Sequence, residues 1–219
     1  MIPSIIDSLL VVVMLFNLAM LGTSRLSGCI RLFAAQSVVL SVIPVLLELR
    51  QSAVPGIHAV AIAFGAIGLK GILVPSILLR VLRSGEIHRE VQPFLGFTAS
   101  VLFGALITIA GFGLAHRVSL PVATPADLIL PASISTVLIG MVILVSRLKA
   151  LTQVIGYLVL ENGIFIFGLF LLEHVPILVE LGILLDLYVA VFIMGIVVYH
   201  IREEFDHMDT HLLDTLRES

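Results

Sequence analysis

The fold class is decided by residues 157–168, YLVLENGIFIFG, where a glutamate and an asparagine stand in the middle of a long apolar run. The flanks of this stretch consist mostly of Leu, Ile, Val, Phe and Gly. A soluble core would exclude an unpaired carboxyl group from such a run, and a plain membrane anchor would not need one. The rest of the chain has to indicate which environment surrounds Glu161 and Asn162.

Composition indicates a membrane protein. The chain has 219 residues, of which 59% are hydrophobic and 12% are charged, and its mean hydropathy is +1.19. Soluble domains carry roughly 25% charged residues. We therefore expect a single membrane domain with a short polar tail.

Apolar segments that are long enough to cross a bilayer, which takes roughly 20 residues, fill most of the chain. We expect them to be helices, because backbone polar groups in lipid have to be satisfied within each segment and the alternation of a membrane β-barrel is absent. The seven segments are 3–24, 29–49, 57–82, 92–115, 126–146, 149–172 and 178–201. The predicted fold is all-α, a polytopic membrane helix bundle with seven transmembrane helices.

The distribution of Lys and Arg predicts the orientation, because cytoplasmic loops carry an excess of these residues. With the N-terminus outside and the C-terminus cytoplasmic, nine basic residues fall in the inner loops and the tail, two fall in the outer loops, and Lys70 stays inside a span. The inner residues are Arg25, Arg31, Arg80, Arg83, Arg89, Arg147, Lys149, Arg202 and Arg217, and the outer ones are Arg50 and Arg117.

A link with three prolines, residues 121–131, divides the chain. We expect a four-helix membrane part over 1–120 and a three-helix part over 121–201. The cytoplasmic tail, 202–219, has six acidic residues against two arginines and apolar residues at helical spacing. A solvated end and a helix that docks on a cytoplasmic partner both fit this pattern.

The sequence carries no motif of a catalytic or cofactor site. We find no phosphate loop, no dinucleotide fingerprint, no metal-ligand cluster, no catalytic nucleophile pattern and nothing that suggests nucleic-acid binding. The only cysteine, Cys29, can form neither an internal disulfide nor an iron–sulfur cluster. We therefore expect no catalytic residue and no cofactor in this chain, and any redox centres would belong to partner chains.

Ionisable residues inside the spans require a reason, because each costs about 2.5–3.5 kcal/mol at mid-helix on insertion scales. Glu161 lies at the midpoint of the sixth span, too deep to reach either surface, so it has to be protonated, paired or in contact with buried water. Lys70 lies at a matching depth in the third span, and Asp186 lies about a third of the way into the seventh. Asp7, near the outer end of the first span, can reach the interface.

Polar and small residues around these charges complete the candidate site. Asn162 can donate and accept hydrogen bonds beside Glu161, and Tyr188 can do so near Asp186. Gly156 and Gly163, seven residues apart, mark a face on which another helix backbone can approach closely.

The third span has the composition of a helix break at Lys70. Gly65, Gly68 and Gly71 surround the lysine, and Pro75 removes one backbone hydrogen bond just beyond it. A Lys70–Glu161 pair that only links helices is one interpretation. Ionisable groups on three different spans favour a proton or ion relay.

The last three spans resemble the small K subunit of respiratory complex I and the C subunit of Mrp-type cation/proton antiporters. The shared features are a basic inner turn, SRLKALTQVIGYL (146–158), a glutamate in the following span and an acid in the last span. The sequence departs from that pattern at two points. Glu161 lies about one turn beyond the Ile-Gly pair at 155–156, and the final acid is an aspartate.

Over nearly its full length the chain more closely resembles component E of hydrogenase-4. The stretches that carry this resemblance are TSRLSGCIRLFAAQSVVL (23–40), LKGILVP (69–75), QVIGYLVLENG (153–163) and VELGILLDLYVAVFIM (179–194). The resemblance implies a non-redox subunit of a complex I-like, formate hydrogenlyase type hydrogenase in a bacterial or archaeal cytoplasmic membrane.

The resemblance also implies partners and residue roles. The partners would be antiporter-like membrane subunits, the membrane subunit that anchors the hydrogenase, and a soluble hydrogenase arm that holds the [NiFe] and iron–sulfur centres. Glu161 and Asp186 would take the roles of the family's two membrane acids in a proton path. From the residues themselves we add Lys70 as the third proton-transfer group, and Asn162 and Tyr188 as supporting polar groups. A subunit of an Mrp-type antiporter, a purely structural membrane anchor, and a lone transporter or receptor are the alternatives.

Overall fold

The computed structural model describes residues 2–51, 57–84, 96–117, 126–147 and 150–171, together with Tyr188. The helices in these ranges are α1 (Ile2–Gly22), α2 (Leu26–Gln51), α3 (Ile57–Ala66), η1 (Ile67–Leu73), α4 (Val74–Ser84), α5 (Phe97–Arg117), α6 (Ile129–Ser146) and α7 (Ala150–Leu171). The segments α3, η1 and α4 follow one another without a break and form one membrane-length rod.

Six helices in the described part are long and apolar enough to cross a membrane. They coincide with the first six predicted segments, so the prediction of an all-α bundle is confirmed. The predicted seventh span, 178–201, lies outside the described residues except for Tyr188, which is helical. Asp186 and the tail, 202–219, also lie outside them.

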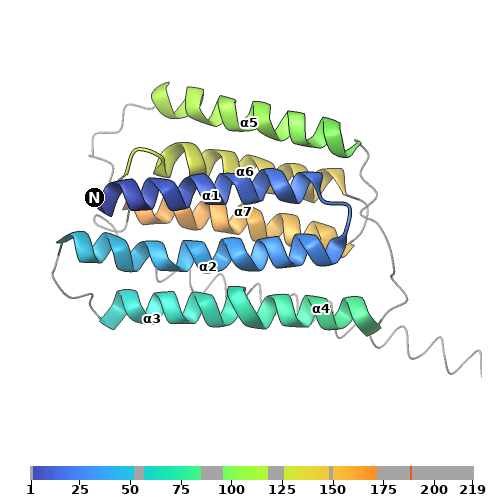
Figure 1. Cartoon of the computed structure of the whole chain (residues 1–219), viewed down its shortest axis with the longest axis horizontal. Helices are drawn as coiled ribbons and strands as arrows, with labels where there is room; N and C mark the ends of the chain where they lie inside the picture. The colour runs from blue at the N-terminus through green and yellow to red at the C-terminus, as the bar shows by residue number, and fades with distance from the viewer. Residues whose placement is uncertain are drawn as a thin grey trace, which may run out of the picture.

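The helices lie side by side and alternate in direction (Figure 1). α1, α6 and α7 form the middle of the bundle, α5 covers one edge, and α2 separates the middle from the α3–η1–α4 rod at the other edge (Figure 1). The C-terminal ends of α1, α4 and α6 lie at the same end of the bundle (Figure 1). Arg25 and Arg147 follow two of these ends and Arg80 lies in the last turns of α4, as their assignment to one membrane side requires.

The closest helix pair is α6 and α7, whose backbones meet at glycines. A Cβ atom on Gly156 would lie 2.5 Å from the backbone nitrogen of Leu144, and one on Gly163 would lie 2.6 Å from that of Val137. Real Cβ atoms do not come this close to backbone atoms. The prediction that Gly156 and Gly163 mark a face of close backbone approach is therefore confirmed, and the neighbour is α6.

The buried apolar side chains form two clusters at different depths. One contains Leu21, Phe33, Ile139 and Val159 among its members. The other contains Val13, Leu40, Ala132 and Ile166. On α1, α2, α6 and α7 the buried side chains between the two clusters are polar, namely Asn17, Gln36, Ser37, Ser133, Ser135, Thr136, Glu161 and Asn162. A polar layer thus crosses the middle of the bundle with an apolar cluster on each side.

Candidate functional site

The polar layer contains a buried ion pair. Lys70 Nζ lies 3.5 Å from Glu161 Oε2, and the two side chains are 6% and 4% exposed. The structure thus brings together the two ionisable residues that the sequence places at mid-depth. A buried carboxylate next to an ammonium group is far less costly than either charge alone.

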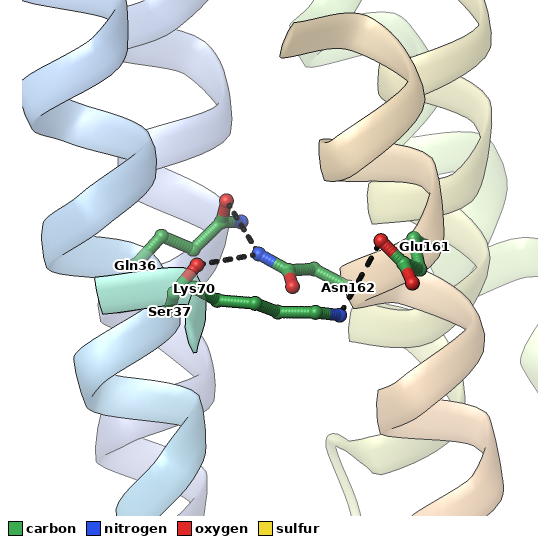
Figure 2. Close-up of polar contacts among 5 residues, drawn as sticks. All are labelled: Gln36, Ser37, Lys70, Glu161 and Asn162. Atoms are coloured by element: carbon green, nitrogen blue, oxygen red, sulfur yellow. Dashed lines mark hydrogen bonds and ion pairs between the residues drawn. The ribbon is translucent and has the colours of Figure 1, made fainter. Parts of the chain in front are cut away.

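Lys70 reaches Glu161 from the opposite side of α2. The rod that carries Lys70 packs mainly against α2, and the aliphatic stem of the lysine extends across the gap toward α7 (Figure 2). The side chain is therefore stretched between the edge of the bundle and its middle. A small rotation of the rod is enough to change the distance between Lys70 Nζ and the Glu161 carboxylate.

The backbone under Lys70 is a π-helix. It covers Ile67–Leu73, and the N–H of Val74 donates to the carbonyl oxygen of Leu69, five residues earlier. Pro75 follows directly and has no N–H to donate, so the regular ladder of the α-helix is interrupted at this point. The predicted break in the helix is thus a continuous helix with a π segment. Such segments are rare and frequently lie at functional sites.

Asn162 connects the ion pair to α2. Its Nδ2 donates to Ser37 Oγ at 3.3 Å and to Gln36 Oε1 at 3.5 Å (Figure 2). Successive residues of α7 therefore face two different neighbours, with Glu161 toward Lys70 and Asn162 toward α2. The supporting role of Asn162 in proton transfer stays a prediction.

Three further polar residues extend the layer to α1 and α6. Gln36 Nε2 donates to Asn17 Oδ1 at 2.8 Å, and Asn17 Nδ2 donates to Thr136 Oγ1 at 2.8 Å. All three side chains are fully buried. The sequence analysis missed them because an uncharged polar residue barely lowers the hydropathy of a span. The signal that could have found them is one amide within each of the first two spans.

Three other residues from the sequence analysis are Asp186, Tyr188 and Asp7. Asp186 falls outside the described residues. Tyr188 is 69% exposed and so does not belong to the buried polar layer. Asp7 accepts the backbone N–H of Leu128, at 3.0 Å, and thereby satisfies a donor at the start of α6. That contact explains an acidic residue near the end of α1 without a role in ion transfer.

A second buried cation, Arg147, lies at the end of α6. Its Nη2 donates to the carbonyl oxygen of Leu21 at 3.0 Å, and its guanidinium carbon lies 5.6 Å from the centre of the Phe97 ring. Burial lowers the pKa of Arg147 from its ordinary value, although a guanidinium stays charged in proteins. The sequence analysis placed this residue in a loop. The structure buries it where α1 ends and α5 begins, which indicates that it joins these helices.

The chemistry that the side chains of the polar layer can support is proton exchange. A search of the described residues for three or more His, Cys, Asp or Glu side chains that could hold a metal ion finds none. The ion pair can hold one exchangeable proton between an amine and a carboxylate, and the neighbouring amides can orient these groups.

The chain is similar to proteins of known sequence over most of its length. It is 31% identical over 195 residues to an uncharacterized protein of Mycobacterium tuberculosis, covering 88% of this chain and 86% of that protein. It is 29% identical over 148 residues to hydrogenase-4 component E of Escherichia coli, covering 68% of each chain. This similarity supports the hydrogenase-4 component E family. The component E of Shigella flexneri matches to the same extent.

Two other comparisons give no match. No protein-family model matches the chain, and no solved structure matches it. The family assignment therefore rests on sequence similarity over 68% of the chain. The resemblance of the last three spans to the complex I K subunit stays a prediction.

Proposed function

We propose that this chain is a non-redox membrane subunit of a complex I-like, formate hydrogenlyase type hydrogenase and that Lys70 and Glu161 carry a step of its proton translocation. The kinship with hydrogenase-4 component E supports membership of a hydrogenase complex. The observation that carries the role in proton transfer is the buried pair, 3.5 Å between Lys70 Nζ and Glu161 Oε2, with the lysine on a π-helix.

The pair can exchange a proton without moving net charge into the apolar interior. In one state an ammonium faces a carboxylate, and in the other a neutral amine faces a neutral carboxylic acid. The sum of charges is zero in both states, so neither has the penalty of a single buried charge. The present N···O distance is longer than an ordinary N–H···O hydrogen bond of about 2.9 Å. Direct transfer therefore requires the two groups to move closer.

The π-helix provides such a movement. Conversion of a π turn to an α turn changes the register by one residue, which rotates the side chains beyond it by about 100° around the helix axis. Lys70 would then leave Glu161 or approach it. Redox chemistry in partner subunits would drive this change. The [NiFe] and iron–sulfur centres would lie in those partners, because a single cysteine cannot hold such a cluster.

The remaining assignments follow from the same family. The chain would lie in a bacterial or archaeal cytoplasmic membrane, next to antiporter-like subunits and the subunit that anchors the soluble hydrogenase arm. Asp186 in the predicted seventh span would continue the proton path.

The test is Glu161→Gln in the native complex. We expect normal assembly and normal hydrogenase activity with a soluble dye, together with loss of proton pumping in membrane vesicles. Normal pumping would refute the relay. A complex that no longer assembles would instead support the structural-anchor alternative.

Identification of the copurifying chains tests the type of complex. We expect antiporter-like subunits together with a hydrogenase-type large subunit and iron–sulfur proteins in a mild-detergent pull-down. Antiporter subunits without a hydrogenase arm would support the Mrp-type alternative.

A further inference from the structure

Three amide side chains form a row that leads from α7 through α2 to α1. The row starts at Asn162, whose Nδ2 lies 3.5 Å from Gln36 Oε1, and continues through the two 2.8 Å contacts from Gln36 to Asn17 and from Asn17 to Thr136. Every member is at most 2% exposed. The row begins next to Glu161 and ends at a hydroxyl group on α6.

The far end of the row lies on a helix that carries two more buried hydroxyl groups. Ser133 and Ser135 of α6 donate to the carbonyl oxygens of Ala132 and Leu130 within their own helix, Ser135 to the former and Ser133 to the latter. Their oxygens can still accept hydrogen bonds from water. The row of amides therefore stands between Glu161 and further polar groups of α6.

Amides are poor links for proton transfer. An Asn or Gln side chain has two N–H donors and a carbonyl acceptor, and it neither takes up nor releases a proton near neutral pH. Proton movement along the row would need water between its members. The contacts of 2.8 Å from Gln36 to Asn17 and from Asn17 to Thr136 are direct hydrogen bonds, which leave no space for water.

Apolar side chains flank the row on two sides. The apolar cluster with Leu21, Phe33 and Ile139 lies on one side of the layer, and the cluster with Val13, Leu40 and Ala132 lies on the other. The amides thus hydrogen-bond to each other between two apolar clusters. Purely apolar residues here would leave Asn162 and Thr136 without these partners.

We propose that Gln36 and Asn17 are positioning residues that form a proton barrier, which closes Glu161 toward α1 and α6 and leaves exchange with Lys70 as its route. This inference rests on the proposed function and deepens it, because it names the direction in which the relay is closed. A pump needs such a closed side, since a carboxyl group open to both sides would let protons flow back.

The test measures passive proton entry rather than pumping. The complex is purified through this chain and reconstituted into liposomes that contain a pH-sensitive dye. A potassium gradient with valinomycin drives proton entry in the absence of hydrogenase substrates. Gln36→Glu places a titratable group of nearly equal shape in the row, and Gln36→Met fills the same volume without one.

We expect Gln36→Glu to raise the rate of proton entry several-fold over wild type and Gln36→Met to leave it unchanged. Adding Glu161→Gln to Gln36→Glu should return the rate to the wild-type value. The barrier is refuted if the Gln36→Glu complex assembles and its rate of proton entry equals that of the wild type. It is also refuted if Gln36→Met leaks equally, or if the leak persists without Glu161.

A second variant covers the case in which Gln36→Glu prevents assembly. Gln36→Ser is uncharged and opens a polar gap large enough for water, so it should leak where Gln36→Met does not. An assembled Gln36→Ser complex without a leak refutes the barrier.

The readouts separate this inference from the proposed function. Loss of pumping in Glu161→Gln is measured under turnover, whereas the leak is measured without it. Suppose that Glu161→Gln pumps normally and that adding it to Gln36→Glu still suppresses the leak. The proton relay through Glu161 is then refuted, whereas the proton barrier at Gln36 is supported.

Discussion

Glycines have opposite surroundings in the α6–α7 pair and in the α3–η1 rod. A side chain at Gly156 or Gly163 would collide with the backbone of α6, whereas a Cβ atom at Gly65 or Gly68 would meet nothing within 4 Å. In the first place glycine allows two helices to touch. In the second, Gly65 and Gly68 face open space, whereas Gly71 of the π segment lies against α2, where a Cβ atom would be 2.9 Å from Val38 Cγ2.

This difference indicates which of the two helices that carry Glu161 and Lys70 can move. Glu161 belongs to a helix that is locked to its neighbour, so the position of its backbone is fixed. Lys70 belongs to the rod that packs mainly against α2. A backbone movement that changes the distance between the two charged groups is therefore expected on the η1 side. Substitutions in α7, in the Lys70–Glu161 ion pair and in the α3–η1 rod test this difference.

The largest effect is expected from Gly156→Ala. The new methyl group would lie 2.5 Å from the Leu144 nitrogen, which is a backbone atom and cannot turn aside. Ordinary overpacking costs about 1–3 kcal/mol, and separation of two helix backbones should exceed it. We expect loss of assembled complex, measured as the yield of the chain in size-exclusion chromatography.

Gly168→Ala is the matched control on the same helix, because nothing lies within 4 Å of a Cβ atom at Gly168. It should assemble like the wild type. Equal yields of the two variants would show that α6 and α7 are not locked at Gly156.

The sequence predicted the parts of the molecule that are costly in lipid. Six of the seven predicted spans lie in the described residues. The contact of Lys70 with Glu161 follows from the penalty on buried charge. The close approach at Gly156 and Gly163 follows from the small size of glycine. These signals are large and local, so one sequence is enough to detect them.

The sequence did not predict features that depend on geometry. Several hydrogen-bond patterns suit the composition of η1, and the glycines around Lys70 together with Pro75 indicated a break without specifying a π-helix. The hydrogen bonds of Asn17 and Gln36 depend on which helices are neighbours, and the hydropathy of each span does not indicate its neighbours. The burial of Arg147 likewise depends on the meeting of three helix ends.

An intermediate effect is expected from Lys70→Met, which removes the ion pair between η1 and Glu161 of α7. Removal of one partner of a buried ion pair costs about 3–5 kcal/mol when the other charge is left behind. We expect a clear fall in the melting temperature of the detergent-solubilised complex. The double variant with Glu161→Gln should recover most of that loss, because no charge is then left in the apolar interior.

Additive losses in the double variant would contradict this prediction. Such a result would mean that Lys70 and Glu161 contribute independently to stability and that the 3.5 Å contact between them carries no coupling.

The smallest effect on stability is expected from Gly68→Ala, in the loose rod. Alanine is favoured over glycine in a helix by about 1 kcal/mol, and the added methyl group meets nothing within 4 Å. The melting temperature should therefore stay the same or rise slightly. Pumping should fall, because a stiffer rod changes register less readily. Gly65→Ala, in α3 outside the π segment, gains the same helix propensity and should pump normally. If both variants pump alike, the mobility of η1 has no part in the relay, and the difference between the two glycine regions concerns packing alone.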